Sequence, residues 1–286
     1  MRSRRIEMKS IIAQKAGLRY EPVAILWSNT KPEGALQPKP QTSGCVMNFI
    51  AQALTKGKTV VFDRDTCLCP GARAGLGFGN GYLTAFGGAG ADFMSAFFVK
   101  GVASSRDPAA YNAIVQHVPE RERDKFIRGE RIFRDVESAK RFMTEESWIT
   151  DIAEKYVVFK PLSNVSPEEK PVSVVFLIDP VQLSGLSIFM GTLRDRPDPV
   201  WIPARMAACQ QIGAAVYAEA KEKQPRAVLG YTDIAARENV GKTIPANMFT
   251  FTVPYSLFLE MEAGVTDSVF DGPIWKGLAA EPGTGQ

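Results

Sequence analysis

The sequence predicts an α/β or α+β fold, with two related halves around a mixed β-sheet flanked by helices. Strand-like and helix-like segments alternate, the order of segments in the first half recurs in the second, and a charged helical region separates them. This recurrence indicates a pseudo-twofold internal repeat within one compact domain. We therefore expect a first half-repeat at 10–105, a helical insertion with a linking strand at 106–165, a second half-repeat at 166–265 and a tail at 266–286.

The first half begins with a strand, which its apolar run predicts over 21–28. After a proline-rich loop, Cys45 begins an amphipathic helix, since the apolar residues over 46–55 recur at helical spacing. A short strand over 59–62 then leads to Asp63 and to a loop that contains two cysteines.

A glycine-rich stretch over 71–90 follows this loop. The glycine spacing around Gly77 does not match the Gly-x-Gly-x-x-Gly that a dinucleotide site places between a strand and a helix. We expect a loop whose backbone approaches another group closely, because glycine removes steric bulk. A bound ligand or cluster would be that group, and Gly77 would contact it.

The middle of the chain, over 108–148, carries mixed charges with apolar residues between them, which is typical of exposed helices over a core. A strand is predicted over 155–162. The second half then repeats the plan of the first, with a strand over 171–178, a helical run that begins at Cys209, and a strand over 226–231.

Two further correspondences support the internal repeat. Asp233 follows a strand of the second half as Asp63 follows one of the first, and an Ala-Arg-x-x-x-Gly frame occurs at 72–77 and again at 236–241. Self-similarity of this kind is a hypothesis that coordinates can test.

Composition excludes several classes of function. The 286 residues carry 34 Lys and Arg against 31 Asp and Glu, a formal charge of +3, so we expect no nucleic-acid partner. No uninterrupted apolar run reaches the roughly 18 residues of a membrane span, and the basic start lacks a secretory apolar stretch, so we expect a cytoplasmic protein without a membrane partner. The single histidine, His117, lies among polar residues, which argues against His-dependent hydrolysis and two-His zinc sites.

Four cysteines are the most informative residues: Cys45, Cys67, Cys69 and Cys209. Without a secretory signal they are more typical of thiols, metal ligands or redox groups than of disulfides. If the halves pack about a twofold axis, Cys45 and Cys209 face each other near helix starts, where the helix dipole favours a thiolate. The Cys67-Leu68-Cys69 loop joins them only if it folds back.

Four converging thiolates suit an iron–sulfur cluster or tetrahedral zinc. The Cys-x-Cys spacing and the lack of a Cys-x-x-Cys knuckle favour a cluster, with 4Fe–4S as first choice and zinc as second. Arg73, Arg237 and Asp233, together with Gly77, are the candidates for contacting a cofactor or ligand, because arginine binds carboxylates and phosphates in a two-pronged way. The alternative is that both arginines tie their own loops, with Asp65 and Asp233 as acceptors.

At these residues the sequence resembles the DUF169 family, over about residues 10–262. The family has no established function, and its occurrence in anaerobic bacteria and archaea implies compatibility with an oxygen-sensitive cluster. The segments that carry the resemblance are Glu21-Pro22-Val23-Ala24, the helix led by Cys45, Cys67 or Cys69 ahead of Gly71-Ala72-Arg73-x-x-Leu76-Gly77, Met206-Ala207-Ala208-Cys209, Gly230-Tyr231-x-Asp233-x-x-x-Arg237 and Phe251-Thr252-Val253-Pro254-Tyr255.

The leading hypothesis is a cytoplasmic cluster-binding protein, as a redox enzyme or an electron carrier, held by the four cysteines. A metal-free module that binds an anionic small molecule through Arg73 and Arg237 is the second. A thiol redox sensor, in which Cys67, Cys69 or Cys209 oxidises reversibly, is the third. The partner would be a small-molecule ligand or a redox partner, and a homo-oligomer remains open. The sequence identifies neither a substrate nor a reaction.

Overall fold

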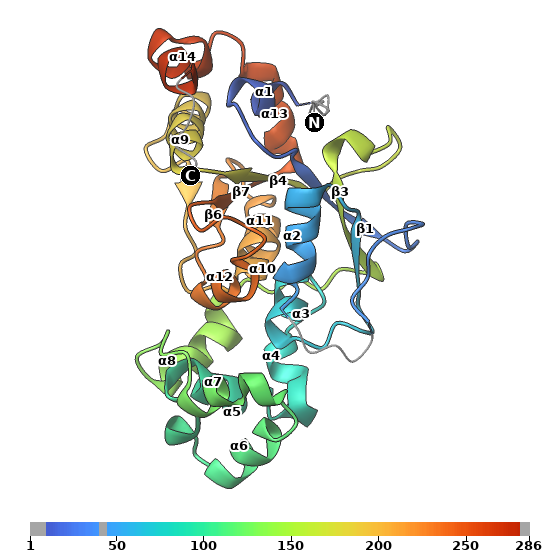
Figure 1. Ribbon diagram of the computed structural model, residues 1–286, viewed down its shortest axis with the longest axis vertical. Helices are drawn as coiled ribbons and strands as arrows, with labels where there is room; N and C mark the ends of the chain where they lie inside the picture. The colour runs from blue at the N-terminus through green and yellow to red at the C-terminus, as the bar shows by residue number, and fades with distance from the viewer. Residues whose placement is uncertain (1–9, 40–44, 281–286) are drawn as a thin grey trace.

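The computed structural model describes residues 10–39 and 45–280. A mixed β-sheet lies in the middle of an elongated molecule, helices cover it, and a helical unit projects from one end (Figure 1). The predicted mixed α/β fold class is confirmed. Among the described residues, no helix is both long enough and apolar enough to cross a membrane.

Seven strands form the sheet in the order β2-β3-β1-β4-β7-β6-β5. All neighbouring pairs are antiparallel except β5 and β6, which are parallel. The central strands are buried on both faces, which explains why they appear in the sequence as continuous apolar runs. The strands are β1 (Val23–Ser28), β2 (Val60–Asp63), β3 (Tyr156–Pro161), β4 (Ser173–Ile178), β5 (Val200–Trp201), β6 (Ala227–Gly230) and β7 (Phe249–Pro254).

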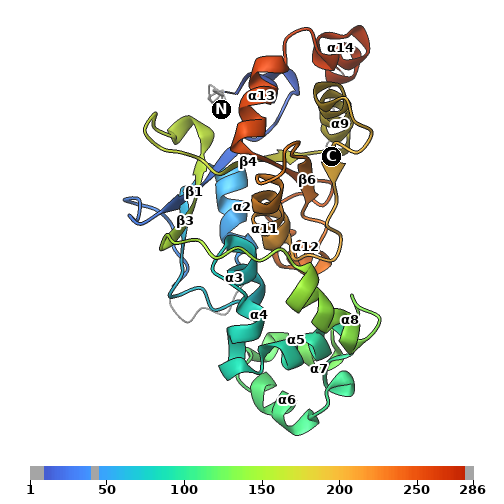
Figure 2. The ribbon, with the colours of Figure 1, turned by 180° about the vertical axis from the view of Figure 1, so that it is seen from behind.

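Helices form a layer on each side of the sheet (Figure 2). Alternate strand residues supply two separate cores, because successive side chains of a strand point to opposite faces. One layer contains α1 (Ile11–Lys15), α9 (Pro180–Arg194), α13 (Tyr255–Gly264) and α14 (Pro273–Ala280). The other layer contains α2 (Met47–Lys56), α3 (Pro70–Leu76), α10 (Ala208–Ile212), α11 (Ala214–Glu219) and α12 (Ile234–Val240).

The strand order bears directly on the expected repeat. Outward from the central β1–β4 pair, β1, β3 and β2 follow one another on one side, as β4, β7 and β6 do on the other. Helix α3 of the first half packs against α10 of the second, and α12 of the second packs against α2 of the first. A twofold axis between the halves would relate the α3–α10 contact to the α12–α2 contact. The duplication itself stays a prediction.

The helical unit has its own core, in which aromatic rings stack around Phe126. This unit begins earlier than the insertion predicted at 106–165, because α5, which precedes residue 106, supplies much of its core. The unit comprises α4 (Gly81–Thr84), α5 (Gly90–Val99), α6 (Pro108–Val115), α7 (Glu120–Arg128) and α8 (Val136–Arg141), with the short turns η1 (Ala85–Gly88), η2 (Gly101–Ser104) and the π-helical η3 (Phe142–Glu146). Elsewhere lie the turns η4 (Leu162–Asn164) and η5 (Val269–Asp271).

The glycine-rich stretch over 71–90 is largely helical, which corrects the predicted loop. Its backbone closely approaches another helix of the same chain. A Cβ atom on Gly75 would lie 2.7 Å from the carbonyl carbon of Cys209, and one on Gly213 would lie 2.1 Å from the carbonyl oxygen of Gly75. The two glycines therefore allow α3 to cross the α10–α11 pair at backbone contact.

The predicted tail over 266–286 also needs correction, because its first part is packed against the body. Trp275 of α14 is buried against Phe270, and its Nε1 donates to the carbonyl oxygen of Lys15 at 3.0 Å. Residues 273–280 thus close one end of the helical layer that contains α1 and α9.

We predict that Gly75→Ala lowers the free energy of unfolding by about 1–3 kcal/mol, because the added methyl group meets backbone that cannot move aside. Urea unfolding measures this change. Gly277→Ala is the control, since a Cβ atom there meets nothing within 4 Å. Equal stability of the two variants would contradict the close crossing of α3 and α10.

Candidate functional site

The fold brings the four cysteines into one region, where several helices of the same layer begin. Cys45 precedes α2, Cys69 is the N-cap of α3, and Cys209 lies in the first turn of α10. Cys67 and Cys209 are buried, and Cys45 and Cys69 are partly buried against the same core. Four thiols from three separate segments of the chain therefore share one buried environment.

Burial is the main cause of a raised pKa at each thiol, and Cys69 is the next cause at each of the other three. The pKa values of Cys45 and Cys67 are raised to about 12, and those of Cys69 and Cys209 are also raised. In this environment the thiols are neutral at pH 7, and a thiolate requires a nearby positive charge.

Backbone amides lower the pKa of two of the thiols and partly oppose the effect of burial. Cys69 is extended, and Pro70 follows it at the first helical position. The amides of Ala72 and Gly71 lower the pKa of Cys69, and the amide of Met47 lowers that of Cys45.

Asp233 lies beside the thiols, at a position equivalent to that of Cys69. It is the N-cap of α12, as Cys69 is of α3. Its Oδ1 accepts from the amides of Ala235 and Ala236, and its Oδ2 accepts from the amide of Ala208 at 3.1 Å. Asp233 therefore connects the start of α12 to the start of α10 and adds negative charge beside Cys45, Cys69 and Cys209.

The two candidate arginines tie their own loops. Arg73 donates to the carbonyl oxygens of Arg64, Cys67 and Phe78. Arg237 donates to the carbonyl oxygens of Ala246 and Met248 and lies over the rings of Tyr231 and Phe249. These contacts match the alternative in which each arginine ties its own loop. The acceptors are main-chain carbonyl oxygens, and not the carboxylates of Asp65 and Asp233. The contacts of Arg73 also hold the loop that carries Cys67.

Gly77, a candidate for contacting a ligand, lies at the other end of α3 from the thiol of Cys69. It is the C-cap of α3, with φ +97°, at the opposite end of that helix from Cys69. A Cβ atom there would lie 3.0 Å from Ile152 Cγ2 and 3.4 Å from Tyr217 Cε2. Glycine is therefore required for the left-handed turn and for close packing.

Sequence reasoning missed a carboxyl group beside the cysteines. Glu130 follows α7 in the helical unit, and burial together with Asp233 raises its pKa to about 7, while Lys125 lowers it and Glu238 raises it. Its charge in turn raises the pKa of Cys45 and Cys69. Only the fold reveals this, because in the sequence Glu130 belongs to a charged pattern typical of an exposed surface.

A buried hydrogen bond also borders the thiols. Tyr82 of α4 donates to Gln210 Oε1 at 3.0 Å, and its pKa is raised by burial and by Cys209 and Cys69. Gln210 Nε2 is buried without a hydrogen-bond partner among the described residues. The sequence contained no signal for this pair, since the two residues lie 128 positions apart.

The thiols are gathered but not arranged as a ready coordination shell. Across residues 10–39 and 45–280, no group of three or more His, Cys, Asp or Glu side chains is positioned to hold a metal ion. Cys209 Sγ instead donates to the carbonyl oxygen of Gly71 at 3.4 Å. Metal binding would therefore require cysteine side chains to rotate toward one another.

One family comparison gives a match. The sequence profile of the DUF169 family, described as uncharacterised ArCR, matches residues 11–264. No curated protein and no solved structure matches the chain.

We predict that Glu130→Gln stabilises the protein by about 1–3 kcal/mol at pH 8 and by much less at pH 5. The folded chain keeps the Glu130 proton up to a pKa of about 7, above the ordinary value of 4.5. Between these values, rising pH ionises the unfolded state first and lowers stability, and glutamine removes this loss. Urea unfolding of both proteins at the two pH values measures it.

The exposed Glu33 provides the matched control. Glu33→Gln should change the unfolding free energy at pH 8 by less than about 0.5 kcal/mol, as an exposed substitution does. A Glu130→Gln effect that is the same at pH 5 and pH 8 would contradict the burial of this carboxyl beside Asp233.

Proposed function

The chain belongs to the DUF169 family, and for this member we propose that Cys45, Cys67, Cys69 and Cys209 hold an iron–sulfur cluster of the 4Fe–4S type in a cytoplasmic redox protein. The observation that carries the proposal is the shared burial of all four cysteines of the chain at the starts of helices that belong to different parts of the fold. Zinc is the second choice of metal.

The charges of the region favour a bound cation. Beside the four thiols lie the carboxyl groups of Asp233 and Glu130, and the cation that lowers a thiol pKa here is Arg73, which acts on Cys67. Burial disfavours thiolates in such a group unless a metal compensates their charge. A metal would therefore convert a set of neutral, poorly reactive thiols into ligands.

The donor set fits a cluster. Thiolates are the usual ligands of iron–sulfur clusters, and hydrogen bonds to sulfur help to set their potential. The amides of Gly71 and Ala72 near Cys69, and of Met47 near Cys45, are the donors that would supply such bonds. Cys209 would give up its contact with Gly71, and the loop of Cys67 is held in place through Arg73.

A bound cluster would supply one-electron transfer at this site. The residues of the chain would define its surroundings: the hydrophobic core limits water, and Glu130 and Asp233 add negative charge that favours the oxidised form. Glu130 comes from the helical unit, so this unit would take part in the site and not only extend the molecule.

The structural features give less support to the other two functions. A thiol redox sensor needs an accessible thiol of low pKa, whereas burial raises the pKa of all four thiols here. A metal-free site based on Arg73 and Arg237 would have to compete with the carbonyl oxygens that both guanidinium groups already contact.

We expect protein prepared without oxygen to be brown and to contain about four iron and four sulfide per chain. Cys69→Ser and Cys209→Ser should each lose most of the iron and the visible absorption while the far-ultraviolet circular dichroism is retained. Metal analysis, sulfide analysis and absorption spectroscopy of the three proteins provide the test.

Met190→Leu serves as the control, because Met190 is a buried sulfur-containing residue in the core on the other face of the sheet. It should retain the full iron content. Colourless protein with stoichiometric zinc would contradict the cluster, and an iron content that both cysteine variants retain would contradict the site.

A further inference from the structure

The side-chain amide of Gln210 is anchored on its oxygen side alone. Gln210 lies in the first turn of α10, directly after Cys209, and it is completely buried. Its Oε1 accepts from the hydroxyl of Tyr82 at 3.0 Å and from the amide of Ala207 at 3.1 Å. Among the residues that the structure describes, none accepts a hydrogen bond from its Nε2.

The contact with Ala207 fixes which way this amide faces. A backbone N–H donates to an oxygen and not to an NH₂ group, so a flipped side chain would set two donors against each other. Tyr82 adds a second contact to the same oxygen. The NH₂ group therefore stays on the opposite side, where a buried donor without an acceptor costs about 1–3 kcal/mol. A bound group that offers an acceptor would remove this cost.

The amide lies in the thiol region. A Cβ atom on Gly71 would lie 3.3 Å from Tyr82 Oη, and the carbonyl oxygen of Gly71 accepts from Cys209 Sγ at 3.4 Å. The hydroxyl that anchors Gln210 and the sulfur of Cys209 thus meet the same residue of α3. Burial, followed by the charges of Cys209 and Cys69, raises the pKa of Tyr82. The acceptor that suits Gln210 is therefore a group bound among the thiols.

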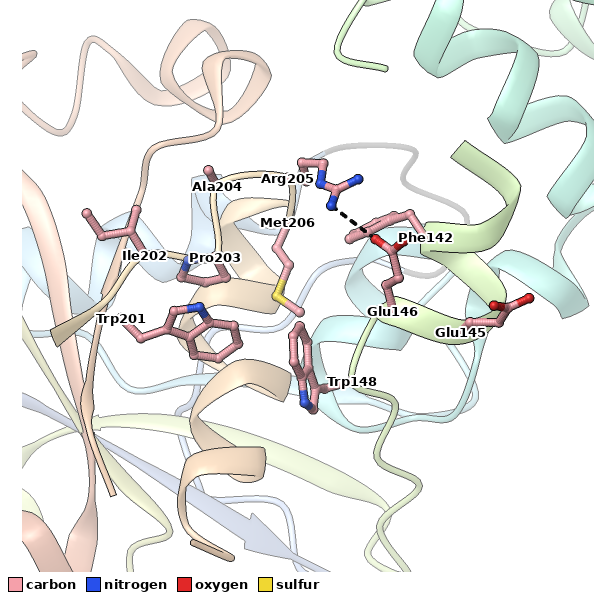
Figure 3. A pocket seen from close by; sticks show the side chains of 10 residues that line it. All are labelled: Phe142, Glu145, Glu146, Trp148, Trp201, Ile202, Pro203, Ala204, Arg205 and Met206. Atoms are coloured by element: carbon pink, nitrogen blue, oxygen red, sulfur yellow. Dashed lines mark ion pairs between the residues drawn. The ribbon is translucent and has the colours of Figure 1, made fainter. Parts of the chain in front are cut away.

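A hollow on the segment that leads into α10 does not supply this acceptor. The hollow opens between Trp148 and residues 201–206 (Figure 3). Neither Gln210 nor any of the four cysteines belongs to its lining. Water in this hollow therefore has no contact with the amide of Gln210.

We propose that Gln210 is a hydrogen-bond donor to the bound centre, with Nε2 donating to a sulfur atom of the cluster and Tyr82 acting as the positioning residue that holds the amide. This inference rests on the function proposed above. Hydrogen bonds to the sulfur atoms of a cluster stabilise the negative charge that reduction adds, and so they raise its potential. Gln210 thus favours the reduced form.

Redox titration of anaerobically prepared protein, followed by visible absorption, tests this role. Gln210→Met keeps the length of the side chain and removes the donor. We expect it to retain its iron while its reduction equilibrium shifts about tenfold toward the oxidised form, which is about 59 mV for one electron. Tyr82→Phe should retain its iron and shift the equilibrium in the same direction by less, because the amide loses one of its two anchors.

Gln182→Met is the matched control, because Gln182 has the same place in α9 that Gln210 has in α10. Its Oε1 accepts from the amide of Asp179 at 2.9 Å, and its Nε2 donates to the carbonyl oxygen of Gly17 at 2.8 Å. Helix α9 belongs to the layer on the other side of the sheet. The variant should therefore have the reduction equilibrium of the unaltered protein, and a shift as large as that of Gln210→Met would overturn the assignment.

The outcomes separate this inference from the proposed function. Full iron content with an unchanged reduction equilibrium in Gln210→Met would overturn the role of Gln210 and leave the proposed cluster unaffected. If Gln210→Met does not fold, an unchanged equilibrium in Tyr82→Phe overturns that role. An unaltered chain that contains no iron would instead contradict the cluster itself, and this inference with it.

Discussion

The crossing of α3 and α10 is the contact on which the rest of the candidate site depends. Gly75 and Gly213 have no side chain to separate the two backbones. At the starts of the same helices, Cys209 Sγ donates to the carbonyl oxygen of Gly71 at 3.4 Å. Cys69 caps the first of these helices, and Cys209 lies in the first turn of the second. A side chain at either glycine would push apart the two segments that bring cysteines from different halves of the chain together.

Burial sets the electrostatic character of the region. Burial raises the pKa of every thiol and of Glu130. The same thiols that sequence spacing identified as ligand candidates are thus held neutral and away from solvent. Burial of this kind makes the thiols poor candidates for free reaction, and this supports the role that we propose for them as metal ligands.

The sequence predicted β1, β2, β3, β4 and β6, because a strand depends on a pattern that a short segment carries. It did not predict β5, β7 or α9. The strand over 21–28 and the helix over 46–55 appear as β1 and α2 with small shifts at their ends. The prediction of a loop over 71–90 was wrong, because glycine there permits two helices to cross closely. Gly77 is the C-cap of α3, a role that a sequence does not distinguish from a ligand contact, because both favour glycine.

The partners of each site residue depended on the fold and could not be inferred. Glu130 is distant in sequence from the cysteines, and Tyr82 is distant from Gln210, to which it donates. Arg73 donates to main-chain carbonyl oxygens, and no residue pattern predicts such acceptors. The central claim is that four cysteine sulfurs share one iron-containing centre. X-ray absorption at the iron edge of anaerobically prepared protein tests it most directly: the account predicts sulfur as the nearest neighbour of iron with further iron beyond it, and a shell of oxygen or nitrogen neighbours would contradict it.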